Sequence, residues 1–319
     1  YYVIRNGSSI IAFRIPTAEW KGFQIMASHS DSPMFKIKEN PEMEAEGHYV
    51  KLNVEKYGGM LCAPWFDRPL SVAGRLVVKE GNQIVTKLVD VKKDLVMIPS
   101  LAIHMNRDAN NGVKFNPQKD LLPLYGDETA KGTFMARIAE LAGVTENDIL
   151  AHDLYVYSRT PGSVWGASEE YISCGRLDDL QCAFGTLKGF LAARPEKSIA
   201  VYCAFDNEEV GSMTKQGADS SFLRCTLERI STALGRSRGE FMASLSSSFM
   251  ISADNAHAVH PNHPELEDPS HRPVPNGGIV IKYSANQKYT TDAVSGAVMK
   301  EICRKAGVPV QIFYKRSDL

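Results

Sequence analysis

Side chains that can bind a metal or move protons follow three apolar segments of the chain, at the point where each segment ends. The segments span residues 22–28, 198–205 and 247–253. The ionisable residues that follow them are, in chain order, His29 with Asp31, Glu208 with Glu209, and Asp254. A further carboxylate, Asp178, lies at the expected start of a helix. Because ligands of open α/β sheets bind beyond the carboxyl ends of the strands, we expect these groups to lie close together.

One imidazole with several carboxylates is the ligand set of a di-zinc or zinc–manganese hydrolase. A bridging carboxylate can hold two ions ~3.5–4 Å apart, where they lower the pKa of a shared water. Glu208 and Glu209 are adjacent, so their side chains point in different directions. One can therefore ligate a metal while the other acts as general base. Asp31 can accept the ring N–H of His29 and thereby fix the tautomer that ligates the metal.

Each of these features also has a simpler explanation. Two adjacent glutamates after a strand usually belong to a solvated loop, and an isolated histidine such as His29 is usually a surface residue or one with satisfied hydrogen bonds. Asp178 at a helix start is favoured by the helix dipole alone. The coincidence of four such features at strand and helix ends is what favours a metal site.

A second concentration of histidines lies further along the chain, at His257, His260, His263 and His271. Prolines at 261 and 264 exclude a helix there, so a zinc site built from a helical row of histidines is not expected. The residues alone leave a surface loop and a functional role equally open. The chain has no GxGxxG, P-loop or GxSxG motif, so the signatures of dinucleotide, nucleotide and serine-hydrolase sites are absent.

The elements that must position these groups alternate between strands and helices. Apolar runs with little alternation, including a fourth run at 277–283, are typical of strands buried on both faces of a largely parallel sheet. From Leu177 the apolar residues follow helical spacing as far as Leu191. A second helix is expected after Asp292, which can cap it, with Gly307 just past its end. The alternation predicts an α/β fold.

Residues 53–165 have a different pattern. Strand-like segments at 74–79 and 83–91 are separated by turns rich in Gly, Pro and Asn, and one helix is expected near 129–141, ended by Gly143. We interpret 53–165 as a β-rich domain inserted into a catalytic domain that comprises 1–52 and 166–319.

The composition is that of an ordinary globular chain, with 44% hydrophobic and 23% charged residues. The 36 Lys and Arg against 37 Asp and Glu give a net charge of −1, which argues against nucleic-acid or membrane-surface binding. The apolar runs are far shorter than the ~20 residues of a membrane span. Six scattered cysteines without a CxxC pair indicate reduced thiols, and we expect a cytoplasmic protein.

The chain resembles the aspartyl aminopeptidases in four motifs, which are SHSDSP at 28–33, GRLDDL at 175–180, DNEEVGS at 206–212 and SADNAHAVHPN at 252–262. IPSLAIHMNR at 98–107 and NGGIVIKYSANQKY at 276–289 also fit, so the resemblance runs nearly end to end. It implies a metallopeptidase α/β domain with a central mixed, largely parallel sheet flanked by helices, interrupted by a β-rich dimerisation domain. It also implies dimers that assemble into a tetrahedral dodecamer, and peptide substrates with N-terminal Asp or Glu. The implied cofactors are two divalent metal ions, Zn²⁺ in the first place, with Mn²⁺ or Co²⁺ as alternatives.

The resemblance also implies roles for individual residues. The implied ligands of one metal are His29, Asp178 and Asp254, with Asp178 bridging to a second metal that Glu209 also binds. The implied catalytic residues are Glu208 as general base, Asp31 beside His29, and His104, which reaches the active site of a neighbouring subunit. The positions that match substrate contacts are His104, Glu208, His257, Lys282 and Tyr289.

The chain departs from the family pattern in two places. Asp179 stands where the family usually has asparagine, and we expect its carboxylate to point away from the metals. The second metal of the family takes an imidazole from a C-terminal Met-His-Ser motif, which we expect to lie beyond Leu319. We therefore expect the chain to be an internal piece of a longer protein, with every ligand of one metal and without one ligand of the other.

The main hypothesis is a di-metal aminopeptidase that removes N-terminal Asp or Glu from peptides. One alternative is a related tetrahedral metallo-aminopeptidase of broader specificity, which a panel of aminoacyl substrates would distinguish. The other is a catalytically silent assembly or cargo protein, against which the intact pair Glu208 and Glu209 argues.

Overall fold

The structure, a computed structural model, describes residues 1–16 and 19–318. The chain divides into two compact units, Tyr1–Ala253 and Asp254–Leu319. The first unit contains a mixed sheet and an antiparallel sheet, and the second contains a small parallel sheet.

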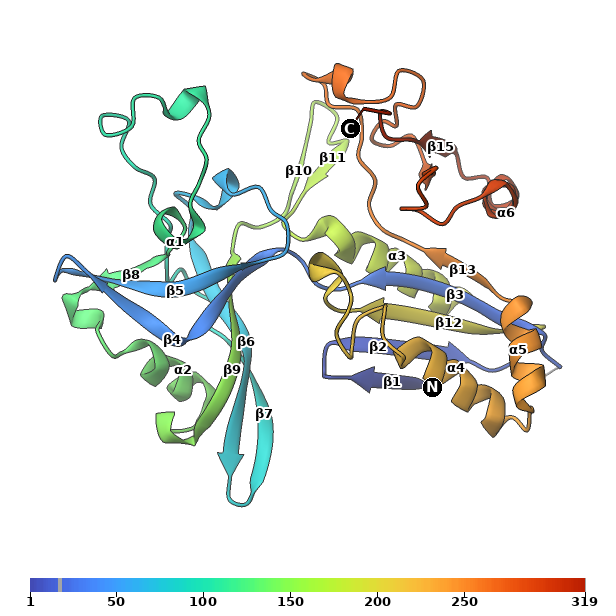
Figure 1. Cartoon of the computed structure of the whole chain (residues 1–319), viewed down its shortest axis with the longest axis horizontal. Coiled ribbons are helices and arrows are strands. Elements are labelled where there is room, and N and C mark those ends of the chain that lie inside the picture. The colour runs from blue at the N-terminus through green and yellow to red at the C-terminus, as the bar shows by residue number, and fades with distance from the viewer. Residues whose placement is uncertain (17–18, 319) are drawn as a thin grey trace. The chain divides into compact units, whose positions relative to one another are not determined.

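One of the two large sheets of the first unit is mixed and has five strands (Figure 1). Its strands, in order across the sheet, are β1 (Tyr2–Arg5), β2 (Ser9–Arg14), β12 (Ser198–Phe205), β3 (Gly22–His29) and β13 (Phe249–Ser252). β3 runs parallel to both of its neighbours, β12 and β13, whereas β2 and β1 add to the far edge of β12 in antiparallel fashion. A mixed sheet with covering helices confirms the expected α/β fold class.

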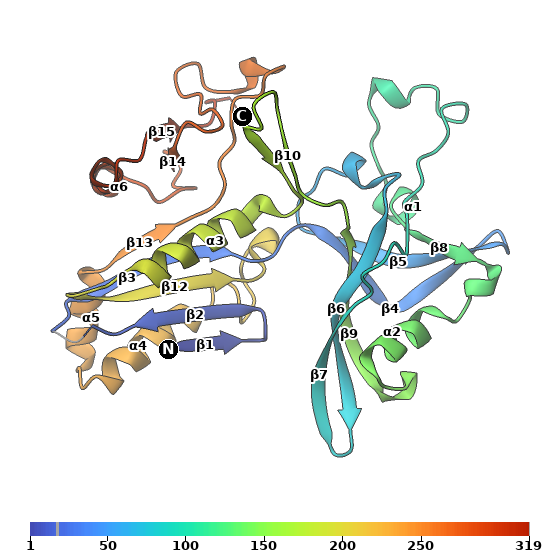
Figure 2. The ribbon, with the colours of Figure 1, turned by 180° about the vertical axis from the view of Figure 1, so that it is seen from behind.

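Helices cover both faces of this sheet. α3 (Leu177–Ala192) packs on one face against β3 and β12, whereas α4 (Phe222–Ala233) and α5 (Arg238–Ser246) lie on the other face (Figures 1 and 2). The side chains of β12 alternate between two apolar cores, with Ile199, Val201, Cys203 and Phe205 beside α4 and α5, and Ala200, Tyr202 and Ala204 beside Phe190 of α3. Burial on both faces explains why the sequence of this strand is an uninterrupted apolar run.

The second sheet of this unit is antiparallel and has six strands. In order across the sheet they are β7 (Gln83–Asp90), β6 (Leu70–Glu80), β9 (Ile149–Ser158), β4 (Met34–Ala45), β5 (Tyr49–Tyr57) and β8 (Leu124–Asp127). α2 (Phe134–Ala142) buries Phe134 and Ile138 in the apolar core of this sheet. It ends at Gly143, which adopts the expected left-handed conformation with a φ of 66°.

The β-rich segment was expected to begin at residue 53. In the structure it begins at Met34, because β4 and β5 both pair within the six-stranded sheet. Phe35 and Ile37 are buried while Lys36 is partly exposed, which is the alternation of a strand with one solvated face. The apolar run of β3 therefore gives way to an alternating pattern directly after the turn at 30–33. At the other end, the hairpin of β10 (Ser163–Trp165) and β11 (Tyr171–Ser173) spans the expected boundary at 165.

Short helical turns connect several of these elements. They are η1 (Ala63–Trp65), η2 (Ala109–Asn111), α1 (Pro117–Asp120), η3 (Glu128–Ala130), η4 (Glu146–Asp148), η5 (Glu208–Val210) and η6 (Pro264–Leu266). Across residues 1–16 and 19–318, no helix has the length and apolar character needed to cross a membrane.

The second unit contains a β-α-β element. β14 (Ile279–Lys282) pairs in parallel with β15 (Val310–Phe313), and α6 (Ala293–Ala306) lies between them in the sequence. The expected caps of this helix are confirmed, since Asp292 accepts the backbone N–H of Ser295 and Gly307 is left-handed with a φ of 68°. The fourth apolar run was expected in the central sheet but pairs with β15 instead, because an apolar run indicates a buried strand without indicating its partner.

Candidate functional site

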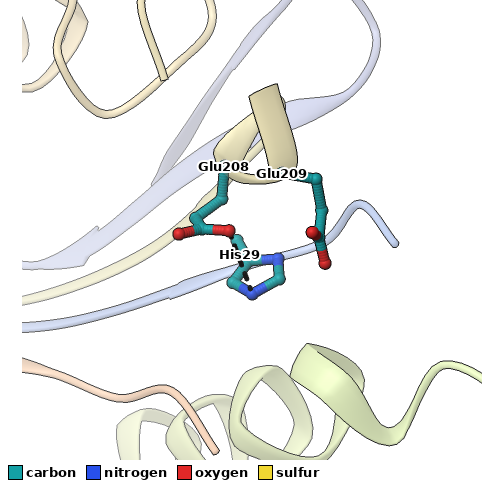
Figure 3. A group of neighbouring side chains, drawn as sticks. All are labelled: His29, Glu208 and Glu209. Carbon is teal, nitrogen blue, oxygen red and sulfur yellow. Dashed lines mark ion pairs between the residues drawn. The ribbon is translucent and has the colours of Figure 1, made fainter. Parts of the chain in front are cut away.

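The candidate site lies where the parallel strands β3 and β12 end side by side. His29, the last residue of β3, pairs in register with Phe205, the last residue of β12, and the backbone N–H of Ser30 donates to the carbonyl of Phe205 at 2.8 Å. The chain then continues from β12 into the short turn η5, which carries Glu208 and Glu209. Figure 3 shows the two glutamates on either side of the imidazole of His29. Strand register thus brings together two motifs that lie far apart in the sequence.

Two groups of potential metal ligands share His29. One group adds Glu208 and Glu209, the other adds Asp178 and Asp179, and within each group the ligand atoms lie within 4.8 Å of one another. His29 Nε2 lies 3.4 Å from Asp178 Oδ1 and 3.9 Å from Glu208 Oε2. Carboxylates from η5 and from the start of α3 therefore face the Nε2 atom of His29 at the end of β3.

The imidazole of His29 is held from its other side by Asp31. Nδ1 lies 3.0 Å from the backbone oxygen of Asp31 and 3.4 Å from its carboxylate oxygen Oδ1, so the carbonyl is the nearer acceptor. A proton on Nδ1 leaves the lone pair on Nε2, which faces Asp178 and Glu208. The ring is buried, with 5% of the residue exposed, so this orientation is fixed by packing as well as by hydrogen bonding.

The carboxylate of Asp31 also organises the turn that carries the glutamates. It accepts the backbone N–H of Glu208 at 3.1 Å and that of Glu209 at 3.2 Å, together with the hydroxyl of Tyr57 at 2.6 Å. Burial alone would raise the pKa of Asp31, but the hydrogen bonds from His29, Tyr57 and the two amides outweigh it and lower the pKa. Asp31 therefore stays ionised and serves as a fixed acceptor beneath the site.

Asp178 and Asp179 are adjacent but lie in different surroundings. The side chain of Asp178 is 61% exposed and faces His29, whereas Asp179 is fully buried. The Oδ2 atom of Asp179 accepts the backbone N–H of His29 at 3.1 Å. A ligand atom of Asp179 also lies within 4.8 Å of those of His29 and Asp178. That its carboxylate points away from the metals stays a prediction.

The electrostatics of the site favour a bound cation. Burial and repulsion by Glu208 raise the pKa of Glu209 to about 7, with smaller contributions from Asp31 and Asp178. Burial lowers the pKa of His29, but its hydrogen bond to Asp31 and the charges of Asp179, Asp31 and Glu208 outweigh burial and raise it to about 9. The carboxylates thus carry more negative charge than one imidazole balances. A bound divalent ion would supply the missing charge, and an imidazole with carboxylate oxygens is a donor set that zinc accepts.

Four of the other predicted site residues lie together in the second unit. Lys282 Nζ forms an ion pair with Asp254 Oδ1 at 3.0 Å, donates to the backbone oxygen of Asn255 at 2.6 Å and lies 5.4 Å from the centre of the Tyr289 ring. The rings of His257 and Tyr289 both pack against Phe313, a buried residue that the sequence did not mark. Ligation by Asp254 of a metal shared with His29 stays a prediction.

His104 lies on an exposed turn between β7 and η2 and is not among the residues that gather around His29. Its predicted role in a neighbouring subunit stays a prediction. Sequence reasoning missed Tyr57, whose hydroxyl donates to Asp31, and Asn207, whose side-chain amide donates to that hydroxyl. The sequence marks Tyr57 only by its place directly before Gly58 and Gly59. That place indicates a role in the site only once β5 is known to end there.

Comparisons with known proteins show the family of the chain. The profile of the family described as "Aminopeptidase I zinc metalloprotease (M18)" matches residues 1–319. The chain is 48% identical over 327 residues to "Probable M18 family aminopeptidase 2" of Clostridium acetobutylicum, and the match covers 100% of this chain and 75% of that protein. A protein of the same name from Stutzerimonas stutzeri is 38% identical over 328 residues, with the same coverage.

Solved structures extend the match to three dimensions. The chain matches one described as "Cryo-EM structure of the Ape4 and Nbr1 complex" with a TM-score of 0.94 and 36% identity, over 100% of this chain and 66% of that one. It matches another, "Structure of S. cerevesiae mApe1 dodecamer", with a TM-score of 0.84 and 29% identity, over 98% of this chain and 73% of that one. The chain therefore spans between 66% and 75% of the length of these relatives. It belongs to the M18 family of zinc metalloprotease aminopeptidases.

Proposed function

We propose that this chain forms most of a metal-dependent aminopeptidase that removes N-terminal Asp or Glu from peptides. The observation that carries the proposal is the buried imidazole of His29, whose Nε2 meets carboxylates from two other segments at the carboxyl edge of the sheet. We propose that His29, Asp178 and Asp254 hold one divalent ion and that Asp178 and Glu209 hold a second. Zinc is the first candidate for both, in keeping with the name of the family.

The residues of the site divide the chemistry of peptide hydrolysis between them. When bound, the ions would polarise the scissile carbonyl and acidify the attacking water. Glu208 takes the proton from this water and later returns it to the leaving amine. Its side chain is 48% exposed, which leaves it accessible to water and substrate, while its backbone N–H is fixed by Asp31. Asp31 contributes by orienting His29 and the η5 turn through its hydrogen bonds.

Selection of acidic N-terminal residues requires a fixed cation, because a carboxylate that leaves water without a partner opposes binding. Lys282 is the candidate, since it lies at the end of β14 and is largely buried, with its ammonium beside Asp254. His257 and Tyr289 lie near it and present ring surfaces to the same cluster. We infer that these three residues contact the N-terminal side chain of the substrate.

We further propose that the six-stranded sheet mediates dimerisation and that dimers assemble into a dodecamer in the cytoplasm. The dodecameric S. cerevisiae relative supports the assembly. The exposed position of His104, outside the group around His29, is compatible with its reaching the site of a second subunit. There it would donate to the oxyanion that develops on the scissile carbonyl.

The test is an assay of the full-length protein on aspartyl, glutamyl and leucyl p-nitroanilides, after dialysis against EDTA and after addition of zinc, manganese or cobalt. We expect no hydrolysis without metal, restoration by at least one of the three ions, and a preference for the acidic substrates. Glu208→Gln is the inactive control. Glu196→Gln, at an exposed position in the loop after α3, is the matched control that retains activity.

Two results would contradict the proposal in different ways. Hydrolysis that survives complete removal of metal would exclude the metal mechanism. Restored activity with equal rates on aspartyl and leucyl substrates would leave the mechanism in place and exclude the acidic specificity.

A further inference from the structure

The end of β5 in the six-stranded sheet reaches the turn that carries the two glutamates. The hydroxyl of Tyr57, the last residue of β5, donates to Asp31 Oδ2 at 2.6 Å and accepts from Asn207 Nδ2 at 2.8 Å. The same carboxylate of Asp31 accepts the backbone N–H groups of Glu208 and Glu209. The hydroxyl of Tyr57 therefore holds Asp31, which accepts from these amides, and also Asn207, at which the turn starts.

Asn207 is held on its other side as well. Its Oδ1 atom accepts from the hydroxyl of Thr214 and from the side-chain amide of Gln216, each at 2.7 Å. Its backbone is left-handed with a φ of 65°, a conformation that asparagine adopts more readily than most residues. The hydrogen bond from Asn207 to Tyr57 thus completes a set of contacts that directs the chain from β12 into η5.

Gly58 contacts the middle of the same turn, at Glu209. A Cβ atom built on Gly58 would lie 2.8 Å from the Cβ of Glu209 and 3.2 Å from its backbone oxygen. The backbone of Gly58 therefore passes directly against Glu209, at a distance that only glycine allows. Its φ of 76° also favours glycine. Tyr57 and Gly58 together contact the turn at Asn207 and at Glu209, on both sides of Glu208.

We propose that Tyr57 and Gly58 are positioning residues, through which the six-stranded sheet holds the glutamate pair in the geometry that the metal centre requires. They act through Asp31, Asn207 and Glu209 and do not themselves ligate metal. The inserted sheet thereby contributes to the active site of its own chain. This inference rests on the proposed function for its effect on metal binding and turnover, but not for its effect on the turn itself.

The first arm of the test needs no metal. Hydrogen exchange of residues 207–212 is compared between the metal-free full-length protein, Tyr57→Phe and Tyr157→Phe. Tyr157 is the matched control, since its hydroxyl donates to Asp90 at 2.7 Å in the same sheet and outside the site. Loss of a hydrogen bond to a charged acceptor predicts exchange about tenfold faster in Tyr57→Phe and unchanged exchange in Tyr157→Phe. Equal exchange in all three proteins would overturn the positioning role.

The second arm measures cobalt binding, by competition with a chelator and by the visible absorption of the bound ion. We expect Tyr57→Phe to bind cobalt about tenfold more weakly, with an altered spectrum and a lowered kcat, because partners beyond the direct ligands typically change affinity by this factor. An unchanged spectrum, affinity and kcat would overturn the effect on the centre. If the unmodified protein bound no cobalt and cleaved no substrate, the proposed function would fail, and the exchange data would still decide the role of Tyr57.

A second variant covers the case in which Tyr57→Phe does not fold. Gly58→Ala is expected to displace Glu209 and to weaken cobalt binding at least as much. Its control is Gly47→Ala in the turn between β4 and β5, where φ is 64° and a Cβ meets no atom within 4 Å. That control introduces comparable backbone strain without a contact. Equal cobalt affinities for these two variants would show that strain, and not contact with Glu209, explains any effect of Gly58→Ala.

Discussion

Glu208 and Glu209 leave the same short turn but differ in their surroundings, and this difference predicts different consequences of substitution. Glu208→Gln removes a proton acceptor and should lower kcat by about 10²–10⁴-fold while metal content stays unchanged. Glu209→Ala removes the proposed ligand of the second metal, whose carboxyl pKa is raised to about 7, so it should deplete metal. Turnover and metal content per subunit, measured on the same preparations, test both expectations.

Glu196→Gln and Glu196→Ala serve as controls for this pair, because Glu196 lies in an exposed loop outside the site. The opposite pattern, in which Glu208→Gln loses metal and Glu209→Ala retains it, would exchange the two roles. Glu208 lies 3.9 Å from His29 Nε2, close enough for it to be the metal ligand of the pair. The measurement therefore decides which glutamate binds metal and which acts as general base.

The proposed role of Lys282 in binding acidic substrates predicts a selective effect of its removal. Lys282→Ala should raise KM and lower kcat/KM for aspartyl substrates by ~1.5–3 kcal/mol, which is the range for a hydrogen bond to a charged group. Leucyl substrates should be affected much less, because they offer the ammonium no partner. Lys288→Ala, an exposed lysine in the following loop, is the matched control.

The ion pair of Lys282 with Asp254 adds a second measurement to this experiment. Metal content must be determined for Lys282→Ala, since removal of the ammonium also leaves Asp254 without its cation. Equal losses on aspartyl and leucyl substrates, with metal content unchanged, would count against a substrate pocket at Lys282.

At the scale of elements, β9 contains an ionisable group that should make the stability of the six-stranded sheet depend on pH. His152 is 6% exposed, and neither ring nitrogen has a hydrogen-bond partner within residues 1–16 and 19–318. Burial lowers its pKa, which the carboxylates of Glu39 and Asp153 oppose and Lys36 reinforces. The unfolded chain, with an ordinary histidine pKa of about 6.5, therefore binds more protons than the folded protein below that pH. Stability should fall as pH decreases through 6.5.

His152→Leu should remove this dependence. The loss of unfolding free energy between pH 7.5 and 5.5, measured by urea denaturation, should shrink by up to ~1.4 kcal/mol per pH unit below 6.5. His48→Leu, at an exposed position in the turn that joins β4 and β5, is the matched control. A slope that His152→Leu leaves unchanged would mean that other groups cause the acid sensitivity.

The elements themselves could be predicted where local chemistry determines them. The caps Asp292 and Gly307 mark α6, Gly143 ends α2, and the uninterrupted apolar run of β12 indicates burial on both faces. What the sequence did not indicate is pairing. β4 and β5 joined the six-stranded sheet and β14 paired with β15, because strand partners are chosen by contacts distant in sequence, which a pattern along the chain does not encode.

The same distinction applies to the site. His29, Asp178 and the glutamate pair were identified from the sequence because each follows or begins an element in a recognisable motif, and the register of β3 and β12 brings His29 and the pair together. Tyr57 and Phe313 were missed because their importance comes from a partner on another element. The contact of Asp179 with the backbone of His29 was missed for a related reason, since it exists only after β3 and α3 pack together.

At the scale of the whole molecule, the proposed sharing of active sites makes a prediction about mixtures of inactive subunits. His104 lies on an exposed turn and is not in the ligand groups that contain His29, and we propose that it acts on another chain. His104→Phe should therefore be inactive, since loss of one oxyanion donor costs ~2.7–4 kcal/mol. Glu208→Gln should be inactive for the separate reason given above.

Mixing the two inactive proteins under conditions of subunit exchange should restore activity. In a symmetric dimer that exchanges this turn reciprocally, a mixed pair has one site with both Glu208 and His104 intact and one site with neither. Random pairing makes half of the dimers mixed, so the mixture should recover about a quarter of the unmodified activity. Each variant exchanged only with itself is the control and should stay inactive. If exchange is verified by mass spectrometry and the mixture remains inactive, His104 acts within its own chain or not at all, because reciprocal sharing leaves no arrangement in which every mixed dimer is silent.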